Sequence, residues 1–374
     1  MDLSSLGHLA VKHTRNAFAE DLYVRGLTDI TRPTVVYGIV NERCNYKCRY
    51  CEYWRRDNYM DEMSIEEWQR ALLSLHEFLG KYHVEFSGGE PFIKKGFVDL
   101  LGFCHAHRIG WGVTTNGSGL VPKFVEKIVE YRPFNMNISI DSNDPESHDY
   151  SRGVKGSFRK VQRGLELLIR QRDAAGLDFP IIIKPVVHRL NFRGAAELVR
   201  WAQDLGPTVV NFQPVDRWTS ETDEELWIEE EDMDDLEGVV RELLLMKKKG
   251  APILNNELVL NAWPMHFRGL PAPEETMPCL VGLRNYFIRP NGDVEVCWNF
   301  PTIGNVKTQS AREIWRGEDA ALRRKETTSC EKLCLFTCLS QKTLKDKVKM
   351  GLTLIKRSSK QNAMSTRKQL KVVR

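Results

Sequence analysis

Residues 44–51 read Cys44-Asn45-Tyr46-Lys47-Cys48-Arg49-Tyr50-Cys51, and the rest of the chain is interpreted outward from this stretch. Three cysteines spaced Cys-x3-Cys-x2-Cys can converge on one metal centre, but they leave a four-coordinate site one ligand short. A structural zinc site is closed by four protein ligands, and a ferredoxin-type iron–sulfur cluster takes four cysteines. A cluster held by three cysteines therefore keeps one iron open to a ligand that is not protein, and a cofactor can react there.

This stretch resembles the signature of the radical S-adenosylmethionine (SAM) enzymes. The resemblance implies a [4Fe–4S] cluster on Cys44, Cys48 and Cys51, with SAM on its open iron and the aromatic Tyr50 near the adenine. It also implies that cleavage of SAM gives a 5′-deoxyadenosyl radical, which abstracts hydrogen from a substrate. A zinc knuckle or three unrelated thiols are the alternatives that this motif alone leaves open.

The composition is that of a globular protein. The chain has 374 residues, of which 42% are apolar, enough for one large or two modest domains. It has no apolar run long enough to span a bilayer, and its first residues lack a basic-then-apolar signal peptide. Nine cysteines without an export signal favour a reducing compartment and metal binding over disulfides, so we expect a cytoplasmic location.

The positive charge is concentrated in the C-terminal tail. Residues 341–374 contain eleven Lys and Arg and one acid, so the tail carries +10 and the remaining chain −6 of the net charge of +4. This distribution argues against a nucleic-acid-binding body. An apolar stripe between the lysines of the tail fits either peripheral contact with the inner surface of an anionic membrane or docking on the protein itself.

Six short β-branched or apolar runs alternate with helical patterns between residues 34 and 215, at residues 34–40, 83–86, 111–115, 134–141, 181–187 and 208–213. Parallel strands need helical crossovers, which this alternation supplies. We therefore predict an α/β fold, a partial (β/α)6 TIM barrel with a small C-terminal α+β auxiliary-cluster domain. The cysteine stretch follows the first strand, at the strand end where α/β barrels carry their chemistry.

Polar residues follow the second, third and fourth predicted strands. Paired glycines let the backbone approach a ligand closely, and a carboxylate can accept hydrogen bonds from an ammonium group. These segments resemble the SAM-binding segments of the family, which implies contacts to the amino group, ribose or carboxylate of SAM from Gly88, Gly89, Glu90, Asn116, Ser139, Asp141 and Arg152. Ordinary strand capping, or a solvated arginine, is the alternative for each of the last four.

A second group of cysteines lies near the C-terminus. Its order, Cys279…Gly-x4-Cys297…Cys330-x3-Cys334-x3-Cys338, resembles the auxiliary-cluster region of the SPASM and Twitch subfamilies. Five cysteines rather than seven match the shorter Twitch type, which implies one auxiliary [4Fe–4S] cluster on Cys279, Cys297 and two of the last three cysteines. A zinc ribbon is the alternative, and Cys104 is interpreted as a buried thiol.

The predicted organisation is a helical lead-in (1–33), a radical SAM barrel (34–215), an acidic helical linker (216–278), an auxiliary-cluster domain (279–340) and a basic tail (341–374). The lead-in is too short for the leader-binding domain of peptide-modifying relatives. We therefore expect an oxidoreductase that acts on a small-molecule or lipid-like substrate, served by an external one-electron donor such as flavodoxin or ferredoxin. A peptide- or sulfatase-modifying maturase and a non-catalytic iron–sulfur or zinc protein remain the alternatives.

Overall fold

A computed structural model describes residues 3–55, 61–206, 208–217, 224–271 and 279–335, with side chains from residue 14 onward. The chain divides into two compact units, Val35–Ser340 and a unit made of Met1–Thr34 with Gln341–Arg374. In the second of these, the predicted lead-in helix is α1 (Leu3–Val24). The basic tail and Cys338 lie outside the described residues.

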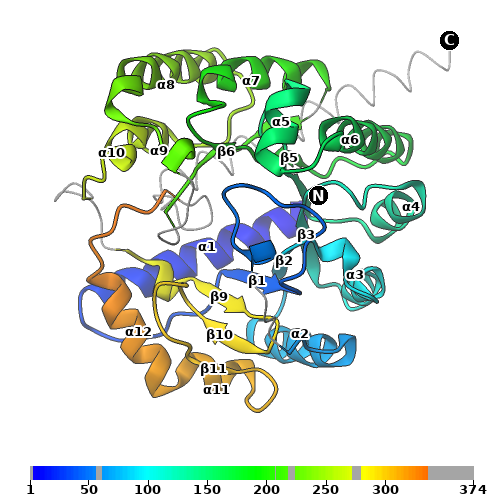
Figure 1. Cartoon of the computed structure of the whole chain (residues 1–374). Helices are drawn as coiled ribbons and strands as arrows, with labels where there is room; N and C mark the ends of the chain where they lie inside the picture. The colour runs from blue at the N-terminus through cyan, green and yellow to red at the C-terminus, as the bar shows by residue number, and fades with distance from the viewer. Residues whose placement is uncertain (1–2, 56–60, 207, 218–223, 272–278, 336–374) are drawn as a thin grey trace, which may run out of the picture. The chain divides into compact units, whose positions relative to one another are not determined.

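The larger unit contains the predicted parallel sheet, in which strands and helices alternate (Figure 1). Its six consecutive strands are parallel and lie in the order β1-β2-β3-β4-β5-β7. They are β1 (Val35–Ile39), β2 (His83–Ser87), β3 (Gly110–Thr115), β4 (Asn135–Ile138), β5 (Ile181–Ile183) and β7 (Thr208–Val210). The α/β class and the six-stranded parallel arrangement are confirmed.

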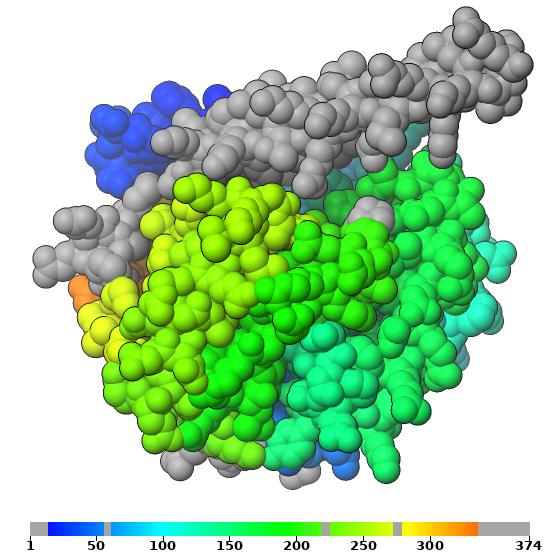
Figure 2. Space-filling view, turned by 90° about the horizontal axis from the view of Figure 1, so that it is seen from above, coloured from blue at the N-terminus to red at the C-terminus, as the bar shows by residue number. Residues whose placement is uncertain are grey.

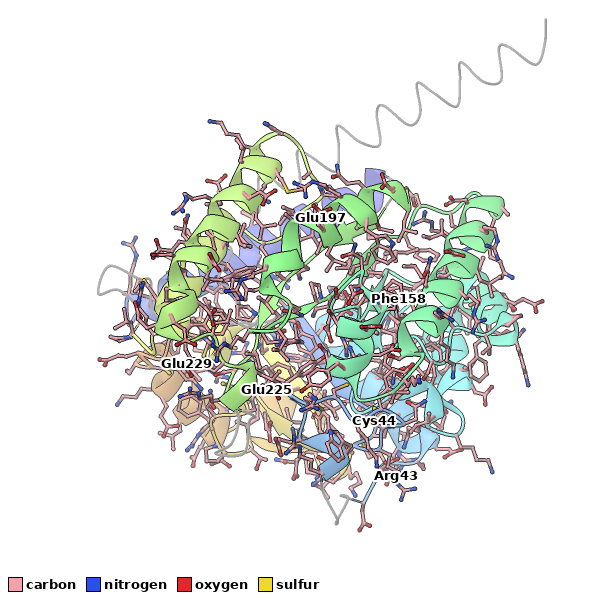
Figure 3. All side chains as sticks on the ribbon, turned by 45° about the horizontal axis from the view of Figure 1, so that its top comes forward. Arg43, Cys44, Phe158, Glu197, Glu225 and Glu229 are labelled. Carbon is pink, nitrogen blue, oxygen red and sulfur yellow. The ribbon has the colours of Figure 1, made fainter. Side chains whose placement is uncertain are left out.

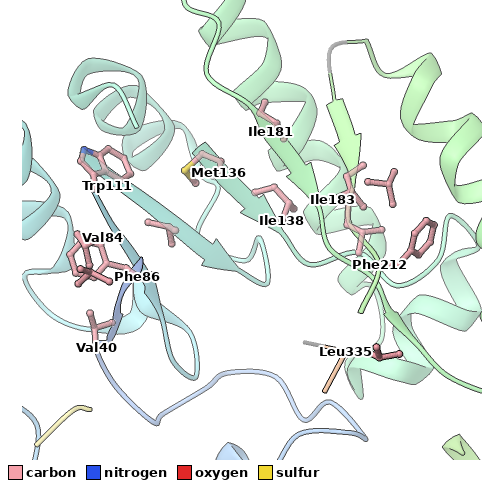
Figure 4. Close-up of a cluster of buried hydrophobic side chains, with 14 of the residues drawn as sticks. Val40, Val84, Phe86, Trp111, Met136, Ile138, Ile181, Ile183, Phe212 and Leu335 are labelled. Carbon is pink, nitrogen blue, oxygen red and sulfur yellow. The ribbon is translucent and has the colours of Figure 1, made fainter. Parts of the chain in front are cut away.

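Amphipathic helices connect the strands and cover the outside of the sheet (Figure 1). They are α2 (Ile65–Leu79), α3 (Phe97–Ala106), α4 (Pro122–Tyr131), α5 (Pro145–Arg152), α6 (Ser157–Ala174) and α7 (Ala195–Asp204). A capping box begins α2, in which Ser64 accepts the backbone N–H of Glu67 and the Glu67 side chain accepts that of Ser64. The buried side chains between helices and sheet form one continuous hydrophobic core, part of which is drawn in Figure 4.

The fifth and sixth predicted strands are each divided into two. After β5 the chain reaches Pro185, which has no N–H to donate, and it resumes as β6 (Val186–Val187). After β7, the backbone N–H of Phe212 donates to the Asn255 side chain, and the chain resumes as β8 (Gln213–Pro214). β6 and β8 form a separate parallel pair that extends the barrel beyond its main sheet.

The auxiliary region contributes strands to the same sheet. β9 (Asn285–Ile288) lies parallel to β1, and β10 (Asp293–Glu295) and β11 (Gly304–Asn305) continue antiparallel from it. A tight turn connects β9 to β10, which pair as an antiparallel hairpin. Helices α11 (Ala311–Arg316) and α12 (Glu318–Thr328) follow, and α11 packs on α2 of the barrel.

The acidic region is not the single solvated helix that the sequence suggested. Two short 3-10 turns, Glu224–Leu226 and Glu230–Asp232, precede α8 (Met233–Lys248). Leu226, at the end of the first turn, and the next two residues, Trp227 and Ile228, are buried. The apolar residues of the acidic run therefore reach the core. Two short helices, α9 (Glu257–Asn261) and α10 (Trp263–Phe267), occupy part of the expected linker, and Figure 2 shows the surface that α7 and α8 form.

In the described part of the chain, no helix combines the length and the apolar character that crossing a membrane requires.

Candidate functional site

The first cysteine loop leaves the carboxyl end of β1 and is held there by the loop that follows β2. The backbone N–H groups of Gly89 and Glu90 donate to the carbonyl oxygens of Asn41 and Arg43 at 3.0 and 2.9 Å. A Cβ atom on Gly88 would lie 2.3 Å from the Asn41 oxygen, and one on Gly89 would lie 2.0 Å from the Arg43 oxygen. Only glycine allows this approach, and Figure 3 labels Arg43 and Cys44 at the start of the loop.

The thiols of Cys44, Cys48 and Cys51 lie close enough to act electrostatically on one another. Burial raises the pKa of Cys44 to about 11 and that of Cys51 to about 12, and the neighbouring thiolate charges contribute in the same direction. Cys44 Sγ accepts from the Tyr46 N–H at 3.4 Å, and Cys48 Sγ lies 3.8 Å from Arg152 Nη1. Buried thiols need a compensating positive charge to ionise, and a bound metal cluster supplies one.

Asp141 is the centre of a buried ionic network beside this loop. Its carboxylate accepts the Tyr50 hydroxyl at 2.7 Å, Arg152 Nη2 at 2.8 Å and the Val186 N–H at 2.9 Å, and Arg152 Nε lies 2.8 Å from its second oxygen. Three of these contacts are hydrogen bonds, and the Arg152 guanidinium adds an ion pair. The predicted residues Tyr50, Asp141 and Arg152 therefore come together, with Asp141 holding the other two side chains beside Cys48.

Glu90 is fully buried and bound by this chain on both oxygens. It accepts the Phe92 N–H at 3.1 Å, the Thr115 hydroxyl at 2.8 Å and the Asn116 N–H at 2.8 Å. Burial raises the pKa of Glu90 to about 7, and these hydrogen bonds act in the opposite direction. The carboxylate therefore fixes the loop after β3 next to the loop after β2.

The other two predicted SAM contacts lie at the ends of β3 and β4. The Asn116 side chain donates to Asn45 at 2.9 Å and lies 3.8 Å from Cys44 Sγ. Ser139 is half-buried, and its backbone N–H donates to Thr115 at 2.9 Å. Asn116 thus contacts the cysteine loop directly, whereas Ser139 stands at the sheet edge above it.

Helix α5, which contains the predicted residue Arg152, also contacts the backbone of the cysteine loop. The Arg49 N–H donates to the Ser151 carbonyl at 3.0 Å, and a Cβ atom on Gly153 would lie 2.2 Å from the Lys47 carbonyl oxygen. The buried His188 contacts the Ser151 hydroxyl at 2.9 Å. The sequence signal for this close approach is the glycine that follows the short helix. In the structure Gly153 has φ +63°, which favours glycine.

A hydroxyl without a partner also points to a ligand at the first site. Tyr46 lies within the cysteine loop and is 3% exposed, yet its hydroxyl has no hydrogen-bond partner. Arg152, Glu90 and the loop thiols all act electrostatically on it. Three facing thiols with a buried donor among them fit a bound cluster with a polar cofactor.

The second group of cysteines is also brought together. The thiols of Cys279, Cys297, Cys330 and Cys334 act electrostatically on one another, and burial raises the pKa of Cys334 to about 12. Cys297 also accepts hydrogen bonds from the backbone and side chain of Asn299. Four thiols are the ligand set of a [4Fe–4S] cluster, so the described residues fit one auxiliary cluster.

Cys104 lies apart from both cysteine groups. Cys104 is fully buried on α3 and contributes to the hydrophobic core. Across the described ranges, no set of three His, Cys, Asp or Glu side chains is arranged to hold a single metal ion.

Comparison with protein families finds two matches along the chain. Residues 39–186 match the radical SAM superfamily, and residues 279–339 match SPASM, an iron–sulfur cluster-binding domain. The first match contains the Cys44 loop with the strand-end residues, and the second contains the later cysteines. A radical SAM domain carries a [4Fe–4S] cluster with SAM, and a SPASM domain carries auxiliary iron–sulfur clusters.

Curated relatives match over different lengths. The PqqA peptide cyclase of Methylocella silvestris is 26% identical over 178 residues, which are 47% of this chain and 46% of the cyclase. The chain thus spans less than half the length of that relative. The AdoMet-dependent heme synthase of Methanosarcina barkeri is 26% identical over 312 residues, which are 78% of this chain and 84% of the synthase.

Solved structures share the fold. Streptococcus suis SuiB bound to S-adenosylmethionine superposes with a TM-score of 0.61 at 18% identity, over 78% of this chain and 68% of SuiB. The structure of anSMEcpe with bound AdoMet gives a TM-score of 0.62 at 16% identity, over 79% of this chain and 84% of that chain.

Proposed function

Because this chain belongs to the radical SAM superfamily and carries a SPASM iron–sulfur domain, we propose that it oxidises a small-molecule or lipid-like substrate by hydrogen abstraction. The observation that carries the proposal is the presence of two separate thiol groups, three thiols in the Cys44 loop and four around Cys297. When bound, the first cluster with SAM supplies a 5′-deoxyadenosyl radical, and the auxiliary cluster supplies an acceptor for the second electron.

The side chains around the first loop support this chemistry by positioning. Asp141 holds Arg152 beside Cys48, so a fixed positive charge stands next to a ligand thiolate. The Tyr50 hydroxyl donates to the same carboxylate, which fixes its ring next to the third cysteine. Glu90 and the two preceding glycines hold the opposite wall, where the resemblance places the amino group of SAM.

The match to the heme synthase supports a small-molecule substrate. It extends over most of both chains, whereas the match to the peptide cyclase covers under half of each. We propose an external one-electron donor such as flavodoxin or ferredoxin, since the SAM-binding cluster must be reduced before each cleavage. The auxiliary ligands in this proposal are Cys279, Cys297 and two of Cys330, Cys334 and Cys338.

Anaerobic reconstitution of the full chain tests the proposal. We expect about eight irons per chain, two [4Fe–4S] clusters, and release of 5′-deoxyadenosine when dithionite and SAM are added. Cys48→Ala should abolish cleavage, while Cys104→Ala, which removes a thiol from the core, should retain it. Binding of zinc alone, or the absence of 5′-deoxyadenosine from the reconstituted wild type, would contradict the proposal.

A second candidate is modification of a peptide, as the name of the PqqA peptide cyclase suggests. The same reconstituted chain distinguishes the two. If a short encoded peptide raises 5′-deoxyadenosine formation and changes in mass, the second candidate is supported. If the product appears in the small-molecule fraction, the first is supported.

A further inference from the structure

The inner face of the barrel carries polar side chains where a parallel sheet is usually apolar. Side chains alternate along a strand, and Val84 and Phe86 of β2 point to the helices, where Phe86 packs edge-on against Trp68 of α2. Figure 4 shows this helix-facing layer, which also contains Trp111, Met136 and Ile138. Glu85, Gly112, Asn135 and Asn137 occupy the intervening positions and therefore face the inside of the barrel.

These four residues form a cradle of oxygen atoms, which we call the Gly112 cradle. Asn135 and Asn137 of β4 both donate to Glu85 Oε2 at 3.2 Å, across β3. Gly112 lies between them in register with Glu85 and Asn135. The point where a Gly112 Cβ would lie is 2.5 Å from Asn135 Oδ1, 2.5 Å from Glu85 Oε2 and 2.7 Å from Glu85 Oε1.

The cradle contains an acceptor that lacks a donor. Asn135 is 6% exposed, and its Oδ1 is buried with no hydrogen-bond partner. Both amide donors go to Oε2 of Glu85. Buried acceptors in native proteins are nearly always satisfied, so oxygens grouped in this way indicate a ligand that donates hydrogen bonds.

The charge of the cradle favours a cationic donor. Burial raises the pKa of Glu85 to about 7, while the hydrogen bonds from Asn135 and Asn137 and the charge of Lys184 lower it. A protonated amine has three N–H donors, enough for Asn135 Oδ1 and for the carboxylate of Glu85.

We propose that the Gly112 cradle binds a primary amino group of the substrate and so selects a polar, amine-bearing small molecule over a lipid-like one. The proposal rests on the proposed function, because the cradle lies inside the barrel whose strand ends carry the cysteine loop and its SAM-binding residues. Glu85, Asn135 and Asn137 are binding residues in this account, and Gly112 is required because a Cβ atom there would meet the oxygens of Glu85 and Asn135 at 2.5–2.7 Å and displace them.

Binding of simple amines to the full chain tests the proposal directly. Ethanolamine, glucosamine and spermidine are titrated under anaerobic reducing conditions, and N-acetylglucosamine serves as the uncharged counterpart of glucosamine. We expect saturable binding of at least one amine and at least about tenfold weaker binding of N-acetylglucosamine. Glu85→Gln, which keeps the shape and removes the charge, should weaken amine binding about tenfold or more.

Two variants serve as matched comparisons. Gly112→Ala keeps the charge of Glu85 but fills the cradle, and its added methyl group meets only movable side-chain ends, so it should fold and lose amine binding. Glu77→Gln makes the same chemical change on the exposed face of α2 and should bind as wild type does. Circular dichroism spectra that match wild type establish that each variant is folded.

Three outcomes overturn the inference: no amine binds saturably, Glu85→Gln and Gly112→Ala bind as wild type does, or decanoate binds and displaces the amine that binds best. SAM cleavage without substrate, measured on the reconstituted wild type, is independent of these titrations. Failure of cleavage would reject the proposed function, whereas failure of amine binding with cleavage intact would reject only the amine.

Discussion

The substitution Glu85→Gln should make the stability of the folded chain less dependent on pH, because it removes a buried carboxyl group that ionises. Burial raises the pKa of Glu85 from 4.5 to about 7, so the folded chain holds a proton that the unfolded chain loses above pH 4.5. The stability contributed by this residue is therefore complete below pH 4.5 and falls as the pH rises to about 7. Above that range the ionised carboxylate costs about 3 kcal/mol, at about 1.4 kcal/mol for each pKa unit.

Glutamine does not ionise and has the shape of the protonated acid. The variant should match wild type near pH 5 and should be more stable by about 2–3 kcal/mol at pH 8. Urea unfolding of the full chain, followed by tryptophan fluorescence across this pH range, measures the difference. Glu77→Gln, on the exposed face of α2, controls for the loss of one negative charge.

The size of the stability difference matters less than its change with pH. Every other titrating group is common to both proteins, so its contribution cancels in the comparison. A stability difference between Glu85→Gln and wild type that stays constant from pH 5 to 8 would refute the reasoning, because Glu85 would then ionise in the folded chain as readily as in the unfolded one.

Three further predictions concern the two thiol sites. Arg152→Ala leaves the carboxylate of Asp141 buried without its cation and should lower the free energy of unfolding by about 3–5 kcal/mol, measured by urea unfolding; a loss below about 1 kcal/mol would show that the pair is solvated. Gly89→Ala forces a Cβ atom to within 2.0 Å of a main-chain oxygen that cannot move freely, so iron analysis after reconstitution should show about half the wild-type content, and full content would contradict this. Cys104→Ala should keep all iron at a stability cost of about 1 kcal/mol. Cys279→Ala should lose the auxiliary half of the iron and keep SAM cleavage. Equal iron in the two variants would contradict the assignment of Cys279 as a ligand of the auxiliary cluster.

The barrel could be predicted from the sequence because its signals are local. Each parallel strand has β-branched or apolar residues on its helix face, and in β2 and β4 polar residues alternate with them. Each helix shows a regular apolar stripe, and α2 also has its Ser64–Glu67 capping box. The cysteine loop follows β1 immediately, so its place at the carboxyl end of that strand follows from chain connectivity alone.

Other features depend on contacts that have no local signal. The pairing of β9 with β1 joins residues about 250 positions apart, and nothing in the Asn285–Ile288 segment specifies its partner. The burial of Leu226, Trp227 and Ile228 within an acidic run also depends on the surface that the rest of the fold presents. The acidic residues around them predict a solvated face. Burying three consecutive apolar side chains against the core is nevertheless favourable, so this part of the run is buried.

The same distinction applies to the site. The motifs selected polar residues that lie at strand ends, but a motif cannot show whether a polar side chain binds a ligand or another side chain. Asp141 illustrates the point, since Tyr50, Arg152 and the Val186 N–H use its acceptor positions before any cofactor arrives. Asn135 is the opposite case, because it lies inside a strand, carries no motif and has a buried oxygen without a donor. Counting the partners of each buried polar atom therefore separates residues that build the site from residues that are still open to a ligand, and spacing in the sequence cannot make that separation.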